Sequence, residues 1–270
     1  MITSSSNPLV KRLKRLKHKK HRQAEAAYFA EGLRVVLAAL EAGAPIERLV
    51  YSPELLHSRP AWQALERAQA AGVPAVELSA ELFAAVSGRD GPAGLGAILR
   101  QAWVELDELP LAPDGLFAAL FDVADPGNLG AILRSLDAVA GAGLVLVGAT
   151  ADPFHPTAVK ASMGALFRLP LARVASAEAL LGWAQPAGLQ TVATSAHAET
   201  DYRQAAYRMP AVLLFGSEGE GLAPEVLTSA HLAVAIPMLG AATSLNLAVA
   251  AGLMFYQLRN PAEAHDRGEV

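Results

Sequence analysis

The sequence predicts an α/β protein of two domains, the second of them built on a parallel sheet. Its 270 residues are more than one domain of average size needs. Short apolar runs alternate with helical stretches along the chain, which is typical of α/β folds. An acidic, Pro-containing passage at 105–114 separates two such series. We therefore expect a first domain over 1–105, a linker over 106–115, a second domain over 116–262 and a tail over 263–270.

The first domain is expected to open with a helix that is capped by Asn7 and begins at Pro8. Leu9, Leu13 and Leu16 follow at helical spacing, and cations fill the rest of this helix. The elements expected next are a helix over 29–42 that ends at Gly43, a strand at 49–51, a helix over 61–71, and strands at 75–78 and 95–99.

The second domain is expected to contain strands at 116–121, 144–147, 190–193, 212–215 and 232–236. They are continuously apolar, which indicates a parallel sheet covered by helices on both faces. A long apolar helix over 245–258 has few polar positions to mark a solvent face. Another subunit is therefore expected to cover part of it.

The composition excludes several classes of protein. With 53% hydrophobic and 18% charged residues, the chain is too apolar for intrinsic disorder. The absence of Cys excludes disulfides, a thiolate nucleophile and Cys-ligated metals, and it is compatible with a reducing compartment. The basic N-terminus lacks the apolar stretch of a signal peptide, and the longest apolar passages are shorter than the roughly 18–20 residues of a membrane span. We expect a cytoplasmic protein that does not contact membranes.

The charge is segregated along the chain. The net charge is −4, yet residues 1–22 contain eight Lys and Arg and no acid, whereas the rest of the chain has 14 Lys and Arg against 26 Asp and Glu. This arrangement would draw a polyanion toward one end of the chain. A solvated cationic helix face or a contact with another anionic surface is the alternative.

A Gly-rich loop follows the expected strand at 212–215, at residues 214–222 (LFGSEGEGL). Its glycines permit close approach of the backbone to a ligand. Their order differs from the dinucleotide fingerprint GxGxxG, and Glu218 and Glu220 would repel a pyrophosphate while favouring a ligand with cationic groups, such as S-adenosylmethionine. A solvated turn and a nucleotide-dependent oxidoreductase remain the alternatives.

Two further segments carry polar residues in apolar surroundings. Residues 125–134 (DPGNLGAILR) start a helix, on which Asn128 and Arg134 would lie about 120° apart. Arg134 is suited to bind a phosphate, or else it pairs with Asp122 or Asp137 on the surface. Residues 236–251 (IPMLGAATSLNLAVAA) place a Ser and an Asn at the start of the last helix, where a Ser is ordinarily a helix cap.

Together, the three segments resemble the motifs of the SpoU/TrmH family of SPOUT RNA methyltransferases, in the order and spacing of that family. Residues 152–170 (DPFHPTAVKASMGALFRLP) resemble another block of the family, and the match covers about residues 116–258. Residues 1–100, with ITSSSNPLVK at 2–11 and FAEGLR at 29–34, resemble the L30e-like RNA-binding domain of many members.

The resemblance implies a SPOUT domain with a C-terminal trefoil knot and a homodimer formed through that domain. It implies methyl transfer from S-adenosylmethionine to a ribose 2′-hydroxyl of RNA, with no metal. Ribosomal RNA, most of all 23S rRNA, is the preferred substrate and tRNA the runner-up. A catalytically silent RNA-binding protein of the same fold is the alternative of another class.

Carried over by position, the family's active-site residues fall on Asn128, Arg134, Glu218, Ser244 and Asn246. Its cofactor-contacting positions fall on Gly216, Ile236, Met238 and Leu245, with Thr194 and Ser195 as further candidates. RNA contacts are expected at Lys11, Arg12, Lys14, Arg15, Lys19 and Arg22.

A guanidinium is effectively always protonated, so the expected role of Arg134 is electrostatic stabilisation and not that of a base. The chain departs from the commonest family pattern at Thr243, where many relatives have Glu, and at Thr157 and Lys160, where Lys and Arg are frequent. These departures leave the chemistry intact but affect the expected substrate contacts.

Overall fold

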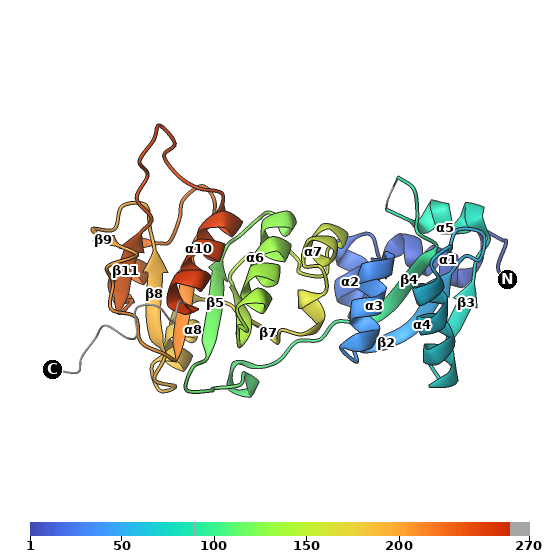
Figure 1. The fold of residues 1–270 in the computed structure, drawn as a ribbon, viewed down its shortest axis with the longest axis horizontal. Helices are drawn as coiled ribbons and strands as arrows, with labels where there is room; N and C mark the ends of the chain where they lie inside the picture. The colour runs from blue at the N-terminus through green and yellow to red at the C-terminus, as the bar shows by residue number, and fades with distance from the viewer. Residues whose placement is uncertain (89, 260–270) are drawn as a thin grey trace. The chain divides into compact units, whose positions relative to one another are not determined.

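A computed structural model describes residues 1–88 and 90–259 of the chain. The chain forms two compact units. The first unit comprises Met1–Ala102 and Asp152–Arg168, and the second comprises Trp103–Ala151 and the chain from Leu169 onward. Figure 1 shows the helices and strands of each unit.

The first unit is built on a four-stranded mixed sheet in the order β1-β4-β2-β3. Strand β4 pairs antiparallel with β1 and β2, and β2 pairs parallel with β3. The strands are β1 (Ala27–Glu31), β2 (Ile46–Tyr51), β3 (Ala75–Glu77) and β4 (Leu95–Arg100). The helices are α1 (Pro8–Arg15), α2 (Lys19–Glu25), α3 (Leu33–Glu41), α4 (Arg59–Ala70), α5 (Ala80–Val86) and α7 (Pro156–Ala161), followed by the 3-10 turn Ala165–Phe167.

Two helix predictions in this unit need correction. The helix expected over 29–42 begins later, because Phe29 belongs to β1 and pairs with Ile98, and Gly32 turns the chain at φ 114° before α3 starts at Leu33. The basic N-terminal helix is in fact two helices, α1 and α2. Asn7 does cap α1, since its side chain accepts from the Leu9 N–H.

Segment Asp152–Arg168, which the sequence places within the second domain, packs with the first unit. The Arg22 side chain is 1% exposed, and its Nε and Nη2 lie 2.8 and 2.7 Å from Asp152 Oδ2. Its Nη1 donates to the carbonyls of Leu16 and Lys17. A charge this deeply buried needs such partners, so the pair attaches the segment to α2.

His155 caps α7 in the same segment through its ring Nδ1, which accepts from the Thr157 N–H. Burial lowers the pKa of His155, and the positive charge of Arg22 lowers it further. The neutral ring that this cap requires is therefore favoured.

The second unit is built on a seven-stranded sheet in the order β7-β6-β5-β10-β8-β11-β9, in which every pair of neighbours is parallel. This confirms the predicted parallel sheet. The strands are β5 (Leu116–Phe121), β6 (Gly143–Val147), β7 (Leu171–Val174), β8 (Gln190–Thr194), β9 (Thr200–Asp201), β10 (Ala211–Phe215) and β11 (Leu232–Ala235). The helices are α6 (Pro126–Ala138), α8 (Ala177–Ala184), α9 (Pro224–Ser229) and α10 (Leu247–Arg259), and a 3-10 turn spans Leu106–Glu108.

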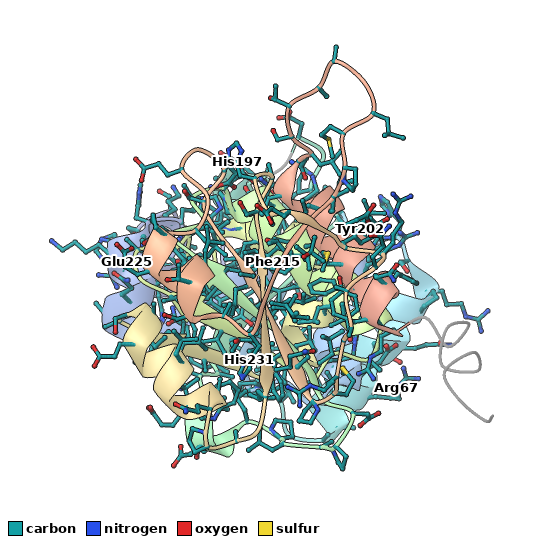
Figure 2. The ribbon with its side chains drawn as sticks, turned by 90° about the vertical axis from the view of Figure 1, so that its left-hand side faces the viewer. Arg67, His197, Tyr202, Phe215, Glu225 and His231 are labelled. Carbon is teal, nitrogen blue, oxygen red and sulfur yellow. The ribbon has the colours of Figure 1, made fainter. Side chains whose placement is uncertain are left out.

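The core of this unit explains where the last helix docks. Phe215 at the end of β10 is fully buried, and Figure 2 shows it within the strands of the sheet. Its ring meets that of Phe255 on α10 edge to face, with centroids 5.8 Å apart. Helix α10 also packs against α6. Among the described residues, no helix is both long and apolar enough to cross a bilayer.

Candidate active site

The three sequence motifs follow the carboxyl ends of parallel strands. Residues 122–128 follow β5, residues 216–221 follow β10, and the passage 236–246 leads from β11 to α10. Because β5, β10 and β11 run in the same direction within one sheet, these segments share one edge of it. Ligand sites of open parallel sheets lie at this edge.

Side chains from the three motifs form a hydrogen-bonded relay. Asn246 Nδ2 donates to Asn128 Oδ1 over 2.9 Å, and Asn128 Nδ2 donates to Glu218 Oε1 over 3.0 Å. The residues are up to 118 positions apart in the sequence. We call these three side chains the amide relay. It confirms that the structure brings Asn128, Glu218 and Asn246 together.

Helix starts hold both amides of the relay in place. Asn246 caps α10, since its Oδ1 accepts from the N–H of Ala248 at 2.9 Å, which leaves Nδ2 to point at Asn128. Asp125 caps α6 and accepts from the Asn128 N–H at 2.6 Å. The alternative in which Ser244 is only a helix cap is therefore wrong: α10 begins at Leu247, and Asn246 is the residue before its first turn.

The Gly-rich loop owes its shape to contacts within itself. A Cβ on Gly216 would lie 2.0 Å from the carbonyl carbon of Gly221, so only glycine fits where the loop closes on itself. Ser217 bridges Gly221, and its hydroxyl accepts from the Glu220 N–H. The glycine at 216 thus allows the loop to close on itself.

Arg134 lies apart from the amide relay. Asn128 is already within α6, so the six-residue spacing places the two side chains about 120° apart around that helix. Arg134 is exposed, and within ranges 1–88 and 90–259 no hydrogen bond or ion pair of its guanidinium is found. Asp122, one suggested partner, accepts instead from the Ala149 N–H. The guanidinium is free to bind an anion.

The remaining cofactor candidates fall into two groups. Thr194 donates its hydroxyl to the Leu214 carbonyl, and the Ser195 hydroxyl accepts from the His197 N–H, so both hydroxyls already have structural partners. The other candidates lie in or beside the connection 236–246, where Leu239 is 95% exposed. They are Ile236, Met238 and Leu245. Ser244, which is expected among the active-site residues, lies in the same connection.

The residues at this edge fit a cationic, partly apolar ligand. Glu218 and Glu220 are exposed carboxylates, which suit a sulfonium and an ammonium group. Leu239 and Leu245 are exposed apolar side chains, which suit the uncharged parts of such a ligand. A Cβ added to Gly219 or Gly240 would meet no atom within 4 Å, so the backbone is open to approach there.

The basic N-terminal segment is only partly free to bind RNA. The prediction for Arg22 is wrong, because its guanidinium is buried against Asp152 and two backbone carbonyls. Arg12 lies 2.7 Å from Glu25 and 2.9 Å from Glu47, which neutralises it. The cations that remain exposed among those predicted are Lys11, Lys14, Arg15 and Lys19.

Comparison with known sequences identifies the family of the chain. The profile of the SpoU rRNA Methylase family matches residues 115–256. The chain belongs to this family. Residues 7–97 of this SpoU methylase match a second profile, the MRM3-like substrate binding domain. The resemblance stated from the sequence is thereby confirmed.

One sequence relative and two solved structures support the assignment. A 23S rRNA (uridine(2479)-2′-O)-methyltransferase of Streptomyces viridochromogenes is 32% identical over 237 residues, which cover 85% of this chain and 81% of that protein. The AdoMet-bound rRNA methyltransferase of Sinorhizobium meliloti is 37% identical, with a TM-score of 0.87 over 99% of this chain and 98% of that one. The SpoU methyltransferase AviRb of Streptomyces viridochromogenes, in complex with AdoMet, is 28% identical, with a TM-score of 0.86 over 97% and 100% of the two chains.

Proposed function

We propose that this SpoU methylase transfers a methyl group from S-adenosylmethionine to a ribose 2′-hydroxyl of RNA, with 23S rRNA as the preferred substrate. The amide relay carries the proposal, since it joins the three motifs at the edge of the sheet where ligands bind. The AdoMet in two related structures supports the cofactor. Similarity to the 23S rRNA 2′-O-methyltransferase of Streptomyces viridochromogenes supports the ribose 2′-hydroxyl as the methylated group and rRNA as the substrate class.

The chemistry asks this chain to position a weak nucleophile and to stabilise charge. S-adenosylmethionine, when bound, supplies an electrophilic methyl group on a sulfonium. The 2′-hydroxyl must face that methyl group in line, which is a task of orientation for Asn128 and Asn246. Negative charge develops on the ribose oxygen as its proton leaves, and the free guanidinium of Arg134 is suited to stabilise it or to hold the adjacent phosphate.

Glu218 completes this arrangement by fixing the direction of the relay. Its carboxylate can only accept, so Asn128 must turn its Nδ2 toward Glu218 and its Oδ1 toward Asn246. The carboxylate also remains exposed to a cationic ligand. Ser244 is retained as a residue that orients the nucleotide or the cofactor.

The proposal includes a homodimer formed through α10. Val249 is 52% exposed, Leu253 40% and Tyr256 61%, and their spacing of four and three residues places them on one face of the helix. This apolar face, which we call the α10 face, suits a second copy of the chain.

The proposal also includes the trefoil knot. It is supported by the path of the chain, which returns from β11, past β8 and β10, to pack on α6. The cytoplasmic location stays a prediction.

The test is transfer of labelled methyl from S-adenosylmethionine to unmodified rRNA and tRNA pools, followed by nuclease digestion. Label in a 2′-O-methyl nucleoside of rRNA is the expected result. Label confined to tRNA would move the substrate to that class, and label on a base would refute the ribose assignment. Ribosome-assembly intermediates serve as a third substrate. Binding of the cofactor without methyl transfer to any of the three would indicate a catalytically silent RNA-binding protein.

A further inference from the structure

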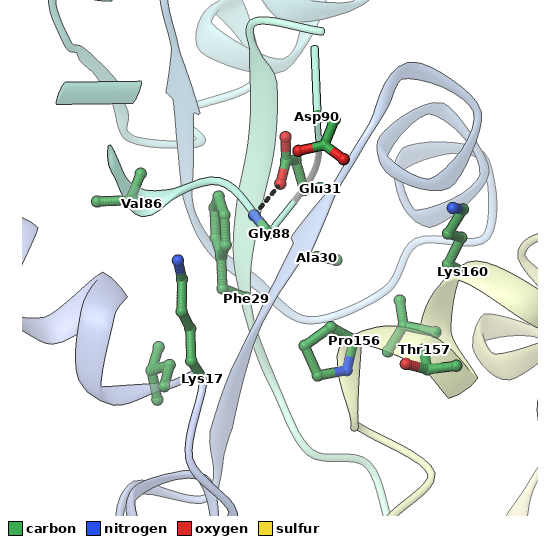
Figure 3. Close-up of a pocket in the computed structure, with 12 residues that line it drawn as sticks. Lys17, Phe29, Ala30, Glu31, Val86, Gly88, Asp90, Pro156, Thr157 and Lys160 are labelled. Carbon is green, nitrogen blue, oxygen red and sulfur yellow. Dashed lines mark hydrogen bonds between the residues drawn. The ribbon is translucent and has the colours of Figure 1, made fainter. Parts of the chain in front are cut away.

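A cavity of about 470 Å³ lies in the first unit, whereas the residues of the amide relay belong to the second. Its lining residues all belong to that unit and come from the turn after α1, from β1, from the end of α5 and the loop after it, and from α7. Figure 3 shows Phe29 in the middle of this group, with Lys17 on one side and Pro156 and Lys160 on the other. The volume lies in the range of about 300–1,000 Å³ that is typical of small-ligand sites.

An aromatic ring stands in the wall of this cavity. Phe29 is partly exposed, and the tip of its ring lies over Gly96 of the neighbouring strand. A Cβ on Gly96 would come within 2.4 Å of the ring, so the glycine makes room for it. A partly exposed ring held in this way offers a stacking surface, which unpaired bases of RNA use on proteins.

Two carboxylates give the cavity hydrogen-bond acceptors. Glu31 is held by the Ser87 hydroxyl, 2.6 Å from its Oε1, and by the Gly88 N–H, 3.1 Å from its Oε2. Each carboxylate oxygen keeps a further lone pair for a ligand. Asp90 has no hydrogen bond or ion pair to the described part of the chain, so its carboxylate is free.

Two ammonium groups give the same cavity positive charge. Lys17 Nζ donates to the Ser87 carbonyl over 2.8 Å and retains two N–H donors. Lys160 is exposed, and no ion pair of its ammonium is found within the described residues. A ligand that fits must therefore combine a flat ring, N–H donors and an anionic group. A nucleotide has all three.

We propose that this cavity binds one unpaired nucleotide of the RNA substrate, and that it prefers guanine. Guanine presents two adjacent donors, N1–H and the 2-amino group, to a carboxylate, whereas adenine and cytosine present one donor beside an acceptor, and uracil presents one between two acceptors. The base stacks on Phe29, Glu31 and Asp90 accept its N–H groups, and the phosphates lie toward Lys17 and Lys160. The inference rests on the proposed function, because it assigns a contact of the same RNA substrate.

The test measures binding of the full-length protein to fluorescently labelled single-stranded RNA octamers by anisotropy. One octamer is all uridine, and the others carry a single central G, A or C. We expect the G octamer to bind about tenfold more tightly than the uridine octamer, as one stacked and hydrogen-bonded base would give. Equal binding of all four octamers would overturn the inference. Tighter binding of free 5′-GMP than of the G octamer would overturn the RNA assignment in favour of a free nucleotide.

Variants connect that preference to the cavity. Phe29→Leu is expected to remove it, and Asp90→Asn to reduce discrimination of G from A about tenfold, whereas Lys160→Ala should weaken all four octamers. Arg67→Ala removes one exposed cation from α4 of the same unit and should leave the preference unchanged (Figure 2). Thermal unfolding checks that Phe29→Leu is folded. If it is not, Asp90→Asn still tests the inference, because Asp90 is exposed and its replacement should leave the fold intact.

Methyl transfer measured on the same samples separates the two proposals. Transfer to rRNA by a wild-type protein with no base preference would refute the cavity assignment alone. A G preference that Phe29→Leu and Asp90→Asn remove, in a protein that methylates no RNA, would refute the proposed reaction alone.

Discussion

Replacing Asn246 by Asp tests the amide relay with almost no change of shape. The Asp keeps an oxygen to cap α10, but it loses the Nδ2 that donates to Asn128. Its carboxylate would then face Asn128 Oδ1 at about the present 2.9 Å. If the side-chain amide of Asn128 flips so that its Nδ2 donates to the new carboxylate, its Oδ1 instead faces the carboxylate of Glu218. One of the two hydrogen bonds is lost in either orientation.

The magnitude follows from what is lost and what is kept. The hydrogen bond that is lost in the balance joins two neutral amides, and such a bond contributes about 0.5–1.5 kcal/mol. Because one carboxylate then faces an oxygen that cannot donate, the upper end of this range applies. The new negative charge at the N-terminus of α10 interacts favourably with the helix dipole and stabilises the fold by about 0.3–1 kcal/mol. We expect Asn246→Asp to lower the free energy of unfolding by about 1 kcal/mol, which is about 2–4 °C in Tm. Methyl transfer should fall about 100-fold, because the positioning of reacting groups is more sensitive than the fold.

Reversing the polarity of the relay supplies the control. In the double variant Asn246→Asp with Glu218→Gln, a turned Asn128 donates to the new carboxylate on α10 and accepts from the new amide in the Gly-rich loop, so both hydrogen bonds form again. Chemical denaturation of the wild type, the two single variants and the double variant should give a coupling energy of about 1 kcal/mol in favour of the double variant. Stabilities that add within about 0.3–0.5 kcal/mol would refute the relay. Wild-type methyl transfer by Asn246→Asp would refute its role in the reaction.

Three further predictions follow from the structure. Arg134→Ala should lower methyl transfer about 100- to 1,000-fold with AdoMet affinity unchanged by calorimetry, since the guanidinium lies apart from the relay; a large loss of AdoMet binding would contradict this role. Tyr256→Asp on the α10 face should convert a dimer to a monomer in light scattering, and a variant that stays dimeric would show that another surface pairs the subunits. The folded pKa of His155 lies below its unfolded value of about 6.5. Its contribution to stability is therefore fully present above the unfolded pKa and is lost as the pH falls from there through the lower folded pKa. His155→Asn keeps a capping side chain and should flatten the decline in Tm between about pH 7.5 and 5, and an unchanged decline would assign it to other groups.

Much of the second unit could be predicted because its signal is local. Continuous apolar strands indicate a parallel sheet, and all five predicted strands are present, although the short strands β7 and β9 were missed. The residues of the amide relay could be named from their motifs. Their contacts could not, because a hydrogen bond across 118 positions has no local signal.

The errors in the first unit have the same cause. Phe29 and the residues after it are apolar enough for either a helix or a strand, and pairing with Ile98 decides for the strand. Arg22 belongs to a run of cations and has no local feature that distinguishes it. Its burial depends on Asp152, which lies 130 positions away.

The excursion of Asp152–Arg168 into the first unit means that the polypeptide passes between the two units three times: after Ala102, after Ala151 and after Arg168. Neither unit is a single continuous stretch of sequence. A fragment that ends at Ala102 would keep Arg22 but lose Asp152, which carries the opposite charge. It would also lose Phe154, whose ring centroid lies 4.8 Å from that of Tyr28. A gene cut at the boundary between the two matched profiles would therefore yield a first unit that lacks part of its own interior. In this protein, the stretch of sequence that matches one family profile and the set of residues that packs as one unit are therefore not the same.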